Sequence, residues 1–191
     1  MESYHSAQSF KIIKNNPQCN FLEDLSKDEA KLMRKKIIEC VISTDMTFHA
    51  KQFTYLKVKI ETFQVQKENN TENMIEGLDR INLSQTQQEF MNIIIHACDI
   101  SNPTKPFEVY SKWADKVMNE FWLQGDREKE LGLPISFLCD RVTNKIPNSQ
   151  IGFIDGIVFP FINSIACLFP NLEFLIENVK KNKLEYEKLK N

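Results

Sequence analysis

An acidic residue, Asp99, follows one of the most apolar segments of the chain and is the first candidate for chemistry. Residues 90–97 are apolar on nearly all sides of a predicted helix, so a buried carboxylate at its end would have to be paired, protonated or bound to a metal ion. His96 lies one turn earlier on the same face, and this H-x-x-D spacing would let both residues bind one metal ion. Two plainer interpretations stay open. Asp99 could cap the following turn, and His96 could be a hydrogen-bonded core residue.

Gln150 is the second candidate, because it opens an almost wholly apolar helix. A buried amide needs partners for both its donor and its acceptor side, and a purine edge offers both. A glutamine in the first turn of a helix is also an ordinary capping residue, so this alternative stays open as well.

Helices must position these residues, because apolar residues recur at helical spacing and the chain has only 5 glycines and 7 prolines. The Ser26-Lys27-Asp28-Glu29 capping box predicts a helix over 26–43. Further helices are predicted over 50–65, 84–98, 107–124, 149–169 and 172–190, with loops at 66–72, 103–106 and 132–134.

For two of these helices the sequence also predicts which residues are buried. The helix over 84–98 should be among the most buried, with Ile93, Ile94 and Ile95 inside except on a face that another part of the domain covers. The helix over 107–124 carries an apolar stripe whose spacing is more typical of core than of a binding wall, formed by Tyr110, Trp113, Val117 and Phe121.

Composition favours one soluble domain over residues 1–191. A net charge of −2 with interspersed signs argues against nucleic acid or an anionic membrane as a partner. The five cysteines are odd in number and contain no C-x-x-C pair, which is typical of reduced thiols in the cytoplasm. No basic leader and no uninterrupted run of 18 apolar residues occurs, so no export signal and no membrane span are expected.

Five segments of the chain carry recognisable motifs: 44–46 (TDM), 96–106 (HACDISNPTKP), 121–128 (FWLQGDRE), 138–141 (LCDR) and 149–155 (SQIGFID). Together they resemble the catalytic domain of class I 3′,5′-cyclic nucleotide phosphodiesterases. Residues 96–106 resemble that family's segment with a metal-binding aspartate, and residues 149–155 resemble its purine-binding segment. The resemblance extends from Glu2 to about Lys183.

The resemblance implies an all-α, compact multi-helix domain of the HD type. Its activity would be hydrolysis of 3′,5′-cyclic nucleotides to 5′-monophosphates by two divalent ions, Zn²⁺ with Mg²⁺ or Mn²⁺, that share a bridging hydroxide. Asp99 matches the aspartate ligand of the first ion. Glu2 and Thr44 match positions that hold water ligands of the second ion.

The same resemblance implies a purine clamp. Gln150 matches the glutamine that hydrogen-bonds the purine edge, Phe153 matches the ring that stacks on the purine, and Val117 matches the aliphatic residue opposite. Asn102 matches an asparagine of adenosine-preferring members, which favours cyclic AMP over cyclic GMP. The remaining matches to the pocket wall are Met46, Tyr110, Trp113, Phe121 and Leu138.

The sequence departs from the family at the catalytic centre. The family's H-N-x-x-H and H-D segments lie upstream of the position equivalent to Glu2 and do not occur here, so the N-terminal portion of the domain, with the general-acid histidine and most metal ligands, is expected to be missing. The leading hypothesis is a phosphodiesterase whose nucleoside pocket this chain supplies. The alternative is a noncatalytic structural or interaction subunit. A cytoplasmic setting is expected, with cytoskeletal association, a homodimer or a larger assembly as options.

Overall fold

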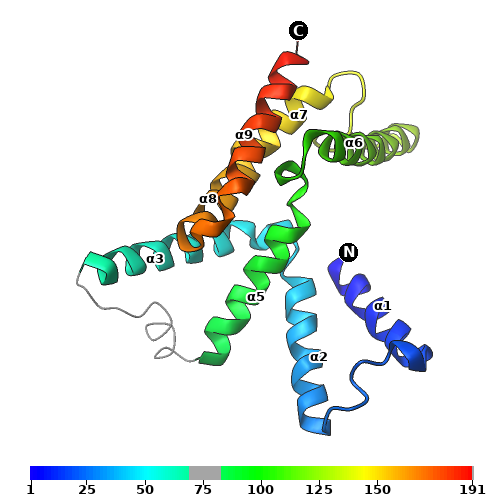
Figure 1. The fold of residues 1–191 in the computed structure, drawn as a ribbon. Helices are drawn as coiled ribbons and strands as arrows, with labels where there is room; N and C mark the ends of the chain where they lie inside the picture. Colours follow the sequence, from blue (N-terminus) through cyan, green and yellow to red (C-terminus); the bar gives the residue numbers. More distant parts are fainter. Residues whose placement is uncertain (69–82, 191) are drawn as a thin grey trace. The chain divides into compact units, whose positions relative to one another are not determined.

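The computed structural model describes residues 1–68 and 83–190 (Figure 1), and all regular structure within them is helical. The helices are α1 (Glu2–Asn15), α2 (Lys27–Ile42), α3 (His49–Glu68), α5 (Leu83–Asp99), α6 (Phe107–Glu130), α7 (Ile146–Phe153), α8 (Phe159–Leu168) and α9 (Glu173–Lys188). The described residues contain no strand, which confirms the prediction of an all-α fold.

The chain divides into two compact units, Met1–Asp99 and Ile100–Asn191. Asp99 is the last residue of the first unit, whereas Asn102, Val117, Gln150 and Phe153 belong to the second. The grouping of residues 1–191 into one domain stays a prediction.

In the first unit, α2 lies between two neighbours, because both α1 and α5 pack against it (Figure 1). The capping box starts α2 as predicted: the Ser26 side chain accepts from the Glu29 backbone N–H, and the Glu29 carboxylate accepts from the Ser26 N–H at 3.0 Å. Arg34 of α2 covers the ring of Phe10 of α1 at 4.1 Å.

The burial predicted for α5 is correct at one of its three isoleucines. Ile93 is 1% exposed, but Ile94 and Ile95 are 49% and 42% exposed, so these two are inside only under the exception that the prediction made for a face covered by another part of the domain. Consecutive helical residues point about 100° apart, and the faces of α5 that Ile94 and Ile95 occupy are not covered by the described chain.

In the second unit, α7, the π-helical segment Ile154–Val158 and α8 follow one another and pack along α9 (Figure 1). The core between them contains Val158, Phe161 and Val179, each 0% exposed. The run Ile146–Leu168 is long and apolar enough to cross a membrane by length and composition alone. Since its core residues pack in this unit beside α9, we interpret it as a core helix.

The apolar stripe predicted on α6 is divided between core and surface. The residues of α6 that are buried recur at a spacing of four residues, namely Tyr110, Ala114 and Met118, with Gly125 further along. Trp113 is 51% exposed, and Val117 and Phe121 are half-buried. A four-residue spacing tracks one side of a helix, so only Tyr110 of the predicted stripe belongs fully to the core.

Helix ends differ from the predictions by a few residues. α3 continues to Glu68 and α6 to Glu130, and Pro147 lies in the first turn of α7, where a proline costs no backbone hydrogen bond. The predicted loop over 66–72 lies outside the described residues from 69 onward. The loop after α6 is present, and Gly132 there has φ 68, a left-handed conformation that suits glycine.

Candidate functional site

The residues predicted to serve the metal centre lie at helix ends of the first unit. Glu2 is in the first turn of α1, and Thr44 follows the end of α2. Asp45 acts electrostatically on the Glu2 carboxyl, which places these two segments near each other. Met46 opens the turn Met46–Phe48 and is 46% exposed, and Asp99 ends α5.

A histidine pair that the sequence reading missed lies in the same region. His49 Nδ1 and His96 Nε2 are 2.9 Å apart, and the Thr44 backbone is a further hydrogen-bond partner of His96. His96 is 0% exposed, so the interpretation of His96 as a hydrogen-bonded core residue is confirmed. Burial lowers the pKa of both imidazoles. The sequence contains only three histidines, and this scarcity was the one signal that could have drawn attention to His49 and His96.

The described residues do not fit a complete two-metal centre. Within residues 1–68 and 83–190 no group of three His, Cys, Asp or Glu side chains could hold a metal ion. Asp99 is solvent-exposed, so the premise that its carboxylate is buried is wrong. Its assignment as a ligand therefore rests on the family resemblance alone and stays a prediction.

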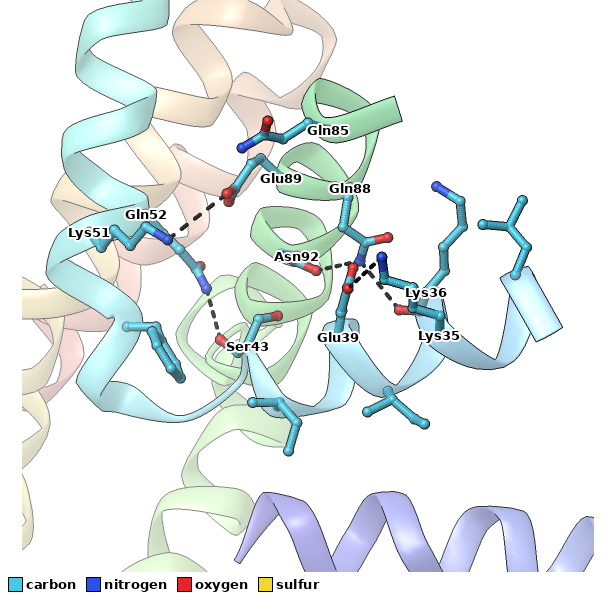
Figure 2. A pocket seen from close by; sticks show the side chains of 14 residues that line it. Lys35, Lys36, Glu39, Ser43, Lys51, Gln52, Gln85, Gln88, Glu89 and Asn92 are labelled. Atoms are coloured by element: carbon cyan, nitrogen blue, oxygen red, sulfur yellow. Dashed lines mark hydrogen bonds and ion pairs between the residues drawn. The ribbon is translucent and has the colours of Figure 1, made fainter. Parts of the chain in front are cut away.

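A cavity of about 610 Å³ also lies in the first unit, between α2, α5 and the start of α3 (Figure 2). Gln52 donates from Nε2 to the Ser43 carbonyl at 2.8 Å, and Gln88 donates to Asn92 Oδ1 at 2.8 Å. Lys35, Lys36 and Lys51 share its wall with Glu39 and Glu89 (Figure 2). No predicted site residue lines this cavity, which is distinct from the predicted purine clamp.

In the second unit a buried hydrogen bond joins two of the predicted site residues. The Tyr110 hydroxyl of α6 donates to Gln150 Oε1 of α7 at 2.8 Å, and the two residues are 1% and 7% exposed. Burial raises the pKa of Tyr110, so its hydroxyl keeps the proton that it donates. The bond gives the acceptor side of the buried Gln150 amide a partner within the protein.

The other residues of the predicted clamp lie on the same two helices. Phe153 is three residues after Gln150 and half-buried, and Val117 is half-buried on α6, which packs against α7. The π-helical segment begins directly after Phe153. Such segments occur often at functional sites.

Side-chain hydrogen bonds hold the loop between α6 and α7 next to the start of α7. Leu138 has φ 67, and its carbonyl accepts from Asn144 Nδ2 at 2.6 Å. The Ser149 hydroxyl, next to Gln150, donates to Asn144 Oδ1. Asn144 therefore links the predicted pocket residue Leu138 to the start of α7.

Comparison with known proteins decides the family. The family model of 3′5′-cyclic nucleotide phosphodiesterases matches residues 1–179. The chain belongs to this phosphodiesterase family. It is 37% identical over 188 residues to the "Probable 3′,5′-cyclic-AMP phosphodiesterase pde-4" of Caenorhabditis elegans, covering 98% of this chain. It is 34% identical over 190 residues to the "3′,5′-cyclic-AMP phosphodiesterase, isoform F" of Drosophila melanogaster, covering 99% of this chain.

Solved phosphodiesterase structures share the fold. LmjPDEB1 in complex with IBMX superposes with a TM-score of 0.81 at 30% identity over 98% of this chain. The phosphodiesterase domain of the RhoPDE fusion protein from the choanoflagellate Salpingoeca rosetta gives 0.80 at 29% identity, again over 98%.

The chain spans only part of these phosphodiesterases. It covers 27% of both the nematode and the fly protein. It covers 52% and 56% of the two solved chains. The family's fold is therefore shared over nearly all of this chain, while about half of each solved chain has no counterpart in it.

Proposed function

We propose that this chain supplies the nucleoside-binding part of a phosphodiesterase that hydrolyses cyclic AMP to the 5′-monophosphate. The observation that carries the proposal is the buried hydrogen bond from Tyr110 to Gln150 Oε1. It holds an amide ready for a purine edge before any ligand is present, which lowers the entropic cost of binding.

The amide suits adenine. Tyr110 occupies one lone pair of Oε1, which leaves the other lone pair and both N–H groups of Nε2 for a ligand. A glutamine amide can pair with the exocyclic N–H of adenine and an adjacent ring nitrogen at once. Guanine carries a carbonyl where adenine carries the amino group, so the same amide orientation would face acceptor to acceptor. The two relatives compared above are named as cyclic-AMP enzymes, which supports the same substrate.

Stacking would supply the rest of the nucleoside affinity. Phe153 lies on the same helix face as Gln150, and Val117 comes from the helix that packs against it. Stacking of an aromatic side chain on a base contributes about 1–3 kcal/mol. In this proposal Asn102, Trp113, Phe121 and Leu138 form other parts of the pocket wall.

The metal ions of the mechanism require residues beyond those described. Asp99, Glu2 and Thr44 would be one ligand and two residues that orient metal-bound waters. Since they do not make a complete site, the role proposed for this chain is purine recognition.

Calorimetric titration of the chain with adenosine 5′-monophosphate (AMP) tests the proposal. We expect AMP to bind more tightly than GMP, and Gln150→Ala to weaken AMP by about 1–3 kcal/mol because it removes the amide. Asn163→Ala, an exposed change on α8, is the control and should leave the affinity unchanged. A well-folded chain that binds neither nucleotide would contradict the proposal.

That negative result would favour the second candidate, a noncatalytic interaction subunit built on the phosphodiesterase fold. The observation that favours this candidate is that the described residues contain no complete metal site. Cytoplasmic location and assembly as a homodimer or with a larger partner stay predictions under either candidate.

A further inference from the structure

Two asparagines of α9 bind the turn that carries Asn102. Asn182 Nδ2 donates to the Pro103 carbonyl at 2.8 Å and to the Lys105 carbonyl at 2.7 Å. One helical turn earlier, Asn178 Nδ2 donates to the Thr104 carbonyl at 3.0 Å. Three consecutive carbonyl groups of the chain are thus held by side chains of a single helix.

These bonds determine where the turn lies. Asn182 is 2% exposed, and both N–H groups of its amide donate to carbonyls of the turn. Pro103 and Thr104 are themselves buried. Since a buried carbonyl without a donor is costly, the turn cannot move away from α9 without losing these bonds. The turn Asn102–Thr104 leads through Pro106 into α6, so its position also sets the start of the helix that carries Tyr110.

The same face of α9 supports Tyr110 directly. Tyr186 is four residues after Asn182 and 2% exposed, and its ring meets the Tyr110 ring edge to face at 5.4 Å and 86°. It also meets Phe107 at 5.2 Å. Tyr110 in turn donates to Gln150. One row of α9, Asn178, Asn182 and Tyr186, therefore contacts both the Asn102 turn and the partner of the candidate purine-binding amide.

We propose that Asn182 is a positioning residue of the nucleoside site, which holds the Asn102 turn and the start of α6 so that Asn102, Tyr110 and Gln150 meet the ligand together. This inference rests on the proposed function, because it assigns Asn182 to the same site. In this role Asn182 acts on the site through the Pro103 and Lys105 carbonyls and through the start of α6.

The decisive variant is Asn182→Asp, which keeps the shape of the side chain but removes both donors and turns an oxygen toward the carbonyls. The matched control is Val179→Ala, because Val179 lies on the same helix, is 0% exposed and makes no bond to the turn. Its truncation lowers the thermal midpoint without removing a hydrogen bond to the turn. AMP affinity is measured by titration at a temperature where every variant is folded, and amide hydrogen exchange is measured at Thr104 and Lys105.

We expect Asn182→Asp to weaken AMP binding roughly tenfold or more and to accelerate exchange at Thr104 and Lys105. Val179→Ala should change affinity less than about twofold at a similar loss of thermal midpoint. Equal affinities for the two variants would overturn the proposal. If Asn182→Asp does not fold, Asn178→Asp decides with the same two readouts, because it removes one donor from a half-buried position.

The two proposals fail in different ways. If the wild-type chain does not bind AMP, the proposed function fails. The exchange rates at Thr104 and Lys105 then still test the bonds from Asn182. Unchanged exchange in Asn182→Asp would overturn the positioning role even where AMP binds.

Discussion

The hydroxyl oxygen of Tyr110 is expected to control the choice between AMP and GMP. Tyr110→Phe removes the hydroxyl that donates to Gln150 Oε1 but keeps the ring against Tyr186. Without the donor the Gln150 amide can turn over and present N–H to the carbonyl of guanine. We therefore expect the ratio of AMP to GMP affinity to fall toward one, with stability lowered by about 1 kcal/mol. Competition titrations with both nucleotides measure the ratio, and an unchanged ratio would show that Tyr110 does not orient the amide.

The His49–His96 pair is expected to make the unfolding free energy depend on pH. Burial lowers the pKa of both histidines in the folded chain, and the neighbouring His49 lowers that of His96 further. As pH falls through the ordinary imidazole value of about 6.5, the unfolded chain takes up protons that the folded chain does not. The unfolding free energy should therefore drop below about pH 6.5, by up to about 1.4 kcal/mol per pH unit for each proton.

Urea unfolding between pH 5 and 7.5 measures this dependence. His49→Gln should flatten the profile, because it removes one of the two titrating rings and the charge that acts on the other. His5→Gln, at an exposed position of α1, is the matched control and should leave the profile as in the wild type. Identical profiles for the two variants would assign the pH dependence to other groups.

At the scale of elements, Gly125 fixes how the loop after α6 returns to that helix. A Cβ atom at Gly125 would lie 2.0 Å from the Cys139 carbonyl oxygen and 2.7 Å from its carbon, so backbone would have to move. We expect Gly125→Ala to lower the unfolding free energy by about 1–3 kcal/mol through overpacking. Gly152→Ala on α7 is the control, since nothing lies within 4 Å of its added Cβ, and it should be neutral or stabilising by about 0.5–1 kcal/mol. Thermal unfolding of both variants checks the sign, and a stable Gly125→Ala would contradict the close approach.

The helices could be predicted because their signals are local. The Ser26 capping box and the prolines at 103, 106 and 147 act within a turn of their own position, and the observed ends fall close to them. Burial within a helix could not be predicted as well. The isoleucines of α5 are alike in sequence, and only the neighbouring helices decide that Ile93 is inside and Ile94 outside.

The site was predictable only in part for a similar reason. Family segments indicated Gln150, Phe153 and Asp99, but the contacts around the site join residues from distant positions of the chain. Asn182 is separated from Lys105 by 77 residues and His49 from His96 by 47. An asparagine in an amphipathic, charge-rich helix gives no signal of its own, because its role depends on which carbonyls the fold brings to it.

At the scale of the whole chain, the small number of possible metal ligands distinguishes nucleotide recognition from catalysis. The sequence holds three histidines, two of which, His49 and His96, pair with each other, and the described residues contain no group of three His, Cys, Asp or Glu side chains that could hold a metal ion. We therefore expect the 191-residue chain, supplied with Zn²⁺ and Mg²⁺ or Mn²⁺, to hydrolyse no cyclic AMP above background while it binds AMP equally well in metal and in a chelator. The purine edge and plane would be recognised by Gln150 and Phe153, which need no ion.

Asp99→Asn is the control and should leave AMP affinity unchanged, since Asp99 faces solvent at the end of α5. Turnover that requires added metal and disappears in Asp99→Asn would contradict this account, because it would show that the chain builds a working metal centre by itself.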